Sequence, residues 1–145
     1  PEVPLAEGLA NKMREAGLTV FGPGRDGAQL EASKDWSKAL MVENNIPTAN
    51  YWTTHSQDES LQILEKFNQP LVIKADGLAA GKGVVVCGST KQAFDAIDMM
   101  LEGGFGDASQ TILVEACITG PELSAFALVD GEDVIWLASA RDHKK

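Results

Sequence analysis

The chain has 145 residues, 44% hydrophobic and 23% charged, which is the composition of a globular protein with room for one domain or two small ones. Its formal net charge of −9 argues against a nucleic-acid-binding surface, because phosphate backbones are bound by basic faces. No stretch reaches the roughly 18 apolar residues that cross a bilayer, and the first residues lack the character of a signal peptide.

The first third of the chain is predicted to be mainly helical. Apolar residues of 5–16 recur on one helical stripe, and Gly17 is expected to end that helix. A short strand is expected over 18–21 and a second helix from about 28 to 43. The sequence Asn44-Asn45-Ile46-Pro47 closes this helix and forms the first candidate domain boundary.

The middle of the chain is predicted to alternate between strands and helices. Strands are expected at 51–53, 71–74 and 84–87. Two helices begin at capping boxes, in which a serine caps the helix and a Glu or Gln follows three residues later. These helices are expected from Ser56 to about Phe67 and from Ser89 to about Leu101.

The last third is predicted to be a flexible loop followed by strands. The loop covers 103–109, and the strands are expected at 111–115, 123–129 and 134–138, with a hairpin turn at Asp130-Gly131-Glu132-Asp133. The fold class is therefore mixed α/β (α+β), with antiparallel pieces rather than a regular βαβ array. Cys87 and Cys117 end apolar runs, which favours free thiols in a reducing cytosol.

A glycine-rich segment from Lys74 to Gly83 is the most informative part of the sequence. Its small residues allow a ligand to approach the backbone, and its lysines suit a polyphosphate. It is not a Walker A loop, because only three residues separate Gly77 from Gly81 and Gly83 follows Lys82. Two interpretations stay open: a loop that folds over a nucleotide, or a mobile hairpin with solvated lysines.

Lys74, at the start of that segment, and three sites after it are further candidates for binding. Lys74 stands in an apolar strand, where its charge needs an anion or a carboxylate partner unless the side chain extends to solvent at the strand end. The linker 115–118 has backbone groups that suit an adenine edge, and Glu122 suits a ribose, although a lone Glu is more often a solvated surface residue. The run 142–145 is either a substrate-facing polar cluster or a charged chain end. The sequence shows no Cys/His metal spacing and no nucleophile with a paired base.

Several of these segments together resemble the phosphoribosylamine–glycine ligases, also called glycinamide ribonucleotide synthetases, of the ATP-grasp superfamily. The similarity covers essentially the whole chain, and the segment Lys74 to Val86 is the most specific part of it. The other matching segments are Gly22-Pro23, Glu31-Ala32-Ser33-Lys34, Ile46-Pro47-Thr48-Ala49, Glu115, Gly120-Pro121-Glu122 and Asp142-His143-Lys144-Lys145.

The resemblance implies a domain plan and an activity. Residues 1–48 would end an N-terminal pre-ATP-grasp domain, 49–110 would form the ATP-grasp lid subdomain, and 111–145 would begin the larger catalytic subdomain. Such ligases use ATP to phosphorylate glycine, and the amine of 5-phosphoribosylamine then displaces the phosphate, in purine synthesis in the cytoplasm. The implied partners are these small molecules, with no nucleic acid and no membrane.

The resemblance also implies site residues, none of them assigned a catalytic role. The nucleotide-binding residues would be Lys34, Lys74, Gly77, Ala80, Gly81, Lys82, Gly83, Glu115, Ala116, Cys117, Ile118 and Glu122. The substrate-facing residues would be Asp142, His143 and Lys144. The sequence departs from the family's pattern at Ala116 and Cys117, where a second Glu and an aromatic residue are usual.

The chain also lacks the family's glycine-rich N-terminal segment and its late Glu and Asn that bind magnesium. We therefore expect magnesium ligands outside this chain, none within it, and no ligase activity from the chain alone as an internal fragment. The alternatives are another carboxylate–amine ATP-grasp ligase or a non-catalytic nucleotide-binding module.

Overall fold

The structure, a computed structural model, describes residues 2–67, 70–79 and 82–142. The α-helices are α1 Glu2–Ala6, α2 Leu9–Glu15, α3 Arg25–Ala32, α4 Lys34–Glu43, α5 Gln57–Leu64 and α6 Thr90–Met99, and two short turns of other helix types are η1 Met100–Gly104 and η2 Gly106–Ser109. The strands are β1 Tyr51–Thr54, β2 Leu71–Ala75, β3 Val84–Cys87, β4 Ile112–Ala116, β5 Leu123–Ser124, β6 Ala127–Asp130, β7 Asp133–Trp136 and β8 Ala140–Arg141.

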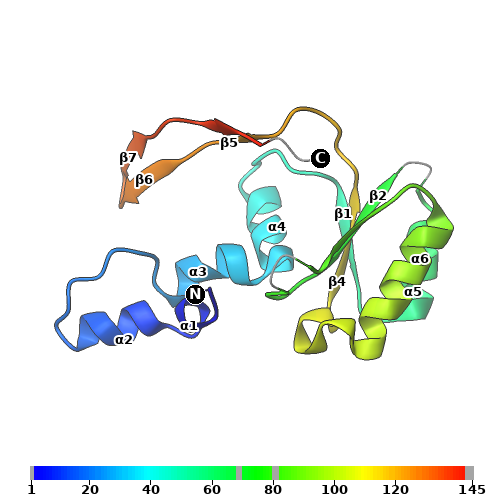
Figure 1. The fold of residues 1–145 in the computed structure, drawn as a ribbon, viewed down its shortest axis with the longest axis horizontal. Helices are drawn as coiled ribbons and strands as arrows, with labels where there is room; N and C mark the ends of the chain where they lie inside the picture. The colour runs from blue at the N-terminus through cyan, green and yellow to red at the C-terminus, as the bar shows by residue number, and fades with distance from the viewer. Residues whose placement is uncertain (1, 68–69, 80–81, 143–145) are drawn as a thin grey trace.

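A four-stranded sheet in the order β1-β4-β2-β3 forms the centre of the molecule, and every neighbouring pair in it is antiparallel. Helices α5 and α6 cover one face of this sheet, and α4 lies on the other side (Figure 1). Alternate residues of β2 point toward α5 and α6, which places Leu71 and Ile73 in the core against Ile97 and Met100. The mixed fold class with antiparallel strands is confirmed.

The predicted helix over 5–16 is wrong in detail, because two helices form there. Gly8 adopts a left-handed conformation with φ 87° and separates α1 from α2, which glycine tolerates at little cost. The strand expected at 18–21 is also wrong. These residues pair with no strand in the described parts of the chain, and the guanidinium of Arg14 instead donates hydrogen bonds to the carbonyls of Val20 and Gly22.

The helix expected over 28–43 is likewise two helices, with a break at Ser33. The backbone of Ser33 is extended, and its hydroxyl accepts a hydrogen bond from the amide of Trp36 as the N-cap of α4. The same hydroxyl donates to the carboxylate of Asp76, at 3.2 and 3.0 Å from its two oxygens. The extended backbone at Ser33 therefore ends α3 and lets one hydroxyl both cap α4 and bond the carboxylate of Asp76.

Both predicted helix starts in the middle of the chain are confirmed. The hydroxyl of Ser56 accepts from the amide of Glu59, and that of Ser89 accepts from the amide of Gln92. Both helices end earlier than expected, α5 at Leu64 and α6 at Met99. The segment 103–109, expected to be a flexible loop, includes the end of η1 and the whole of η2.

The C-terminal residues form two small exposed ribbons. The strand expected over 123–129 is interrupted, because β5 pairs with β8 whereas β6 pairs with β7. The predicted hairpin turn is confirmed between β6 and β7, and Gly131 has the φ of 58° that such a turn needs. No helix among the described residues combines the length and the apolar character needed to cross a membrane.

Candidate functional site

The sheet face opposite α5 and α6 carries the polar candidates. The register of the antiparallel pairs places Lys74 beside Val84 of β3 and Leu113 of β4, while Glu115 pairs with Val72 and Tyr51. Paired residues share a face, so these side chains all lie on the side of α4. Helix α4 covers only part of this face, because Val84 is 44% exposed and Val86 is 68% exposed. An apolar surface beside lysines is left open.

Two lysines from different elements meet at one buried carboxylate on this face. Lys74 of β2 lies 2.9 Å from Oε1 of Glu115, and Lys38 of α4 lies 2.9 Å from Oε2. The Glu115 side chain is 5% exposed, that of Lys38 11% and that of Lys74 27%. Of the alternatives that the sequence left open for Lys74, the structure shows a carboxylate partner, and its role in nucleotide binding stays a prediction. The carboxylate partner is Glu115, a residue that the resemblance places in the linker beside the adenine.

Lys38 is the member of this cluster that the sequence reasoning missed. Its ammonium group also lies 2.8 Å from the hydroxyl of Thr48, 3.2 Å from the carbonyl of Ala49 and 5.5 Å from the ring centre of Tyr51. The available signal was its spacing: Lys38 follows Lys34 by four residues, which puts both on one side of a helix.

Lys34, a predicted nucleotide-binding residue, holds the base of the glycine-rich loop. Its ammonium group donates to the carbonyls of Ala75, Asp76 and Gly77 at 2.8, 3.1 and 3.0 Å, which uses all three of its donors. Burial lowers the pKa of this ammonium below its usual value, and the nearby carboxylates of Asp76 and Glu31 partly oppose that effect. Contact with a phosphate would require Lys34 to exchange at least one carbonyl for it.

The glycine-rich loop is closely packed at Gly77 and at Gly83, near its two ends. A Cβ added to Gly77 would lie 3.0 Å from Ala108, and one added to Gly83 would lie 2.7 Å from the Cβ of Ala79. The carbonyl of Gly83 accepts from the amide of Ala75 at 2.8 Å. Lys82 is exposed. The predicted residues Ala80 and Gly81 lie outside the described residues, and the predicted mobility of the loop stays a prediction.

Two cavities adjoin this loop and the lysines. One of about 270 Å³ is lined by Lys34, Gly77, Leu78, Ala79, Gly83 and Val84, together with Glu2, Val3 and Glu31. Another of about 180 Å³ is lined by Glu31, Lys34, Lys38, Thr48, Lys74 and Glu115 among others. Together they place Lys34, Lys38 and Lys74 next to open space, with carboxylates also present in each lining.

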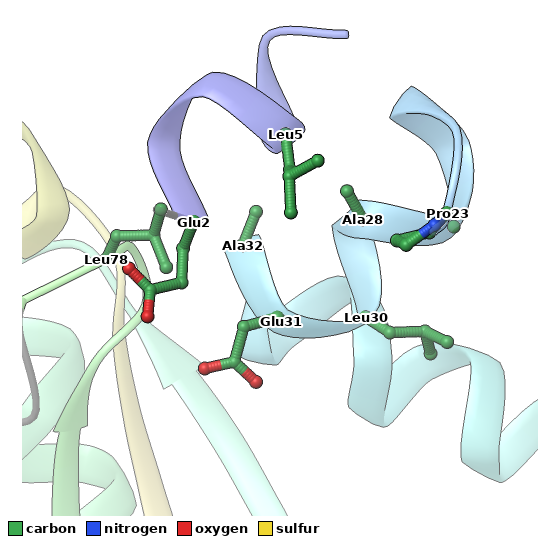
Figure 2. A pocket seen from close by; sticks show the side chains of 9 residues that line it. Glu2, Leu5, Pro23, Ala28, Leu30, Glu31, Ala32 and Leu78 are labelled. Carbon is green, nitrogen blue, oxygen red and sulfur yellow. The ribbon is translucent and has the colours of Figure 1, made fainter. Parts of the chain in front are cut away.

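A third cavity, of about 190 Å³, lies beside the loop but differs in chemistry (Figure 2). Leu78 extends from the loop toward Glu2 of α1, and Leu5, Ala28 and Ala32 supply apolar walls. Glu2 and Glu31 also line the first cavity, but among the described residues no lysine lines this one, so it does not suit a phosphate. It shows how the loop packs against the N-terminal helices.

The predicted adenine linker is partly engaged by the chain itself. We expected its backbone N–H groups to be open, but the amide of Ala116 donates to the carbonyl of Asn50 at 2.9 Å and that of Cys117 to the carbonyl of Pro70 at 3.0 Å. Ile118, the next residue, has a side chain that is 73% exposed. Cys87 and Cys117 are free thiols, as predicted.

The remaining predicted residues lie near the chain's C-terminal ribbons. The amide of Asp142 donates to the carbonyl of Glu122 at 3.2 Å, which brings these two candidates together, and both side chains are exposed. His143 and Lys144 lie outside the described residues. Within the described ranges, no group of three or more His, Cys, Asp and Glu side chains is placed to hold a metal ion.

Comparisons with known proteins point to one family. Residues 32–145 match the family model described as the phosphoribosylglycinamide synthetase ATP-grasp (A) domain. The whole chain is 48% identical to a phosphoribosylamine–glycine ligase of Nostoc sp. and 49% identical to the chloroplastic phosphoribosylamine–glycine ligase of Arabidopsis thaliana. It spans 34% of the length of the first relative and 27% of the second.

A solved structure gives the same picture. The crystal structure of the phosphoribosylamine–glycine ligase of Thermotoga maritima superimposes with a TM-score of 0.78 at 34% identity. The matched region covers 83% of this chain and 31% of the crystallised one.

Proposed function

We propose that this chain, which belongs to the phosphoribosylglycinamide synthetase ATP-grasp (A) domain family, forms the nucleotide-binding part of a phosphoribosylamine–glycine ligase. In the proposed reaction the γ-phosphoryl group of ATP passes to the carboxylate of glycine and ADP leaves. The amine of 5-phosphoribosylamine then attacks the acyl carbon, phosphate departs, and an amide forms. The proposed setting is purine synthesis in the cytoplasm, although the Arabidopsis relative is named as chloroplastic.

The observation that carries this proposal is the open sheet face with its lysines. Lys74 lies on that face next to exposed Val84 and at the start of the glycine-rich loop. A planar base can pack on the apolar strand surface while phosphate oxygens accept from a lysine and from loop amides. Nucleotide binding at this face would require Lys34 and Lys74 to exchange partners within the chain for phosphate oxygens, because both are paired in this structure.

The remaining roles follow the resemblance and are part of the proposal. Lys34, Lys74 and Lys82 with Gly77, Ala80, Gly81 and Gly83 would contact the phosphates. The linker 115–118 would border adenine, Glu122 would hold ribose, and Asp142, His143 and Lys144 would face the other substrates. Residues 1–48, 49–110 and 111–145 would be the three structural parts.

Magnesium is proposed for the complete ligase, where it would offset charge on the transferring phosphoryl group. The described residues offer no cluster of ligands for it. We therefore assign no step of the reaction in this chain to magnesium.

The test is ATP binding and turnover by the full-length protein with Lys74→Met. Loss of a charge-assisted contact costs on the order of 1.5–3 kcal/mol, so we expect ATP affinity to fall about tenfold or more. Lys91→Met is the matched control, because Lys91 forms an exposed ion pair with Asp95 on α6, away from the lysine cavities. A lower melting temperature with unchanged ATP affinity would make Lys74 a structural residue. ADP release that does not depend on glycine and phosphoribosylamine would refute the proposed reaction.

A further inference from the structure

Lys38 is a nearly buried cation to which the proposed function gives no role. Its ammonium group has three oxygen neighbours within 3.2 Å: the hydroxyl of Thr48, the carbonyl of Ala49 and the carboxylate of Glu115. A charge taken out of water is stable only when such partners are present, and an ammonium group has three donors to offer. Lys38 is therefore held in one place by two hydrogen bonds and one ion pair.

Lys74 is held less firmly by the same carboxylate. It lies 2.9 Å from Oε1 of Glu115, yet no hydrogen bond of acceptable geometry reaches that oxygen from the described residues. Lys38 has two hydrogen bonds besides its ion pair with Glu115, whereas the described residues give Lys74 only its ion pair, and the side chain of Lys74 is the more exposed. Of the two lysines, Lys74 is the one that can turn toward a ligand.

We propose that Lys38 is a positioning residue that keeps Glu115 ionised and in place when Lys74 turns from Glu115 to a nucleotide phosphate. This inference rests on the proposed nucleotide-binding function. The Glu115 side chain is 5% exposed. If Lys38 were absent, the departure of Lys74 would leave Glu115 as an uncompensated buried charge, which is strongly unfavourable. With Lys38 in place, the carboxylate keeps one cation throughout, so that Lys74 is free to bind phosphate.

The other charged or titratable groups near Glu115 do not replace Lys38. Lys34, on the same helix, already donates to three carbonyls. Tyr51, on the neighbouring strand, is a phenol and so neutral near pH 7, and burial and the carboxylate of Asp35 raise its pKa further. Among the described residues that face Glu115 from α4, β1 and β2, Lys38 is the cation that remains when Lys74 leaves.

The test is calorimetric titration of the full-length protein with ATP, in buffers of different ionisation enthalpy. We expect Lys38→Met to lower ATP affinity about tenfold or more, because Lys74 then becomes the sole cation on Glu115. We also expect this variant to take up a proton as ATP binds, up to one per nucleotide, because Glu115 must be neutralised when Lys74 leaves. Lys38→Arg should restore affinity without proton uptake.

A double variant separates positioning from a structural role. Lys38→Met combined with Glu115→Gln removes cation and anion together, so Lys74 is no longer held back and ATP affinity should recover most of the loss. Lys91→Met should leave affinity and proton uptake unchanged.

The inference is overturned if the unaltered protein binds ATP and Lys38→Met binds it equally well. It is also overturned if Lys38→Met loses affinity without proton uptake and the double variant is no better. Absence of ATP binding by the unaltered protein would instead overturn the proposed function, and this inference with it.

Discussion

Replacement of Gly83 by alanine tests whether the loop is as tightly closed at its base as the structure shows. The new Cβ would lie 2.7 Å from the Cβ of Ala79 and 3.1 Å from that of Ala75, against an optimal carbon–carbon separation of about 3.5–4.0 Å. Both neighbours are methyl groups, which can move only with their own backbone. Gly83 is buried, so the strain cannot be relieved toward solvent.

The size of the effect follows from two opposing contributions. Overpacking of a closed site costs about 1–3 kcal/mol, whereas replacing glycine by alanine restricts the unfolded chain and stabilises by about 0.4–1 kcal/mol. A net local destabilisation of about 1–2 kcal/mol corresponds to a factor of roughly 5–30 in the opening equilibrium. The amide of Ala75 donates to the carbonyl of Gly83 and reports on that opening.

Hydrogen exchange of the full-length protein measures the opening equilibrium. In Gly83→Ala, peptides from β2 and β3 should exchange roughly 5–30 times faster than in the unaltered protein. Gly88→Ala is the matched control, because its Cβ would meet nothing closer than the side-chain oxygen of Gln92 at 3.6 Å. Adding Ala79→Gly to the Gly83→Ala variant should restore most of the protection. If Gly83→Ala exchanges no faster than Gly88→Ala, or if the second substitution restores nothing, the steric reasoning is wrong.

Three further outcomes are expected. Ser33→Ala should lower thermal stability by about 0.5–2 kcal/mol, because it removes a helix cap and a hydrogen bond to Asp76, while Ser33→Thr should retain most of it. Cys87 should react with iodoacetamide more slowly than Cys117 when the labelled peptides are compared by mass spectrometry, because it is buried and burial raises the pKa of its thiol; equal rates would contradict its burial. ATP affinity should fall as pH rises through the lowered pKa of Lys34, below the usual lysine value of 10.5, and Lys34→Arg should move that decline to higher pH. In that window the unfolded state binds more protons than the folded one, so folding stability should rise with pH while ATP affinity falls.

Local patterns alone were sufficient for much of the middle of the chain. The caps at Ser56 and Ser89, the strands β2 and β3, and the turn at Gly131 each depend on residues within a few positions of one another, so their short-range chemistry was enough to predict them. The need of Lys74 for a partner was also predictable, because a charge in an apolar strand requires one in any fold.

The breaks in the N-terminal helices required tertiary information. Apolar periodicity continues across Gly8 and Ser33, and it predicts longer helices than those that form. At Ser33 the deciding contact is with Asp76, 43 positions away in the chain. Serine favours the N-cap, but at Ser33 the hydrogen bond to Asp76 that accompanies the cap comes from a residue that the sequence does not bring near.

Tertiary packing also determined which residues meet in the candidate site. The sequence alone determined that lysines, a glycine-rich loop and a late glutamate exist in the order that the family shares. The antiparallel pairing of β2 with β4, together with the packing of α4 on their open face, determined that Lys38 and Lys74 share the carboxylate of Glu115. Lys34 likewise met the carbonyls after β2 only through that packing. Charge pairing acts over a few ångströms in space whatever the separation along the chain, and for this reason the tertiary structure alone selected these partners.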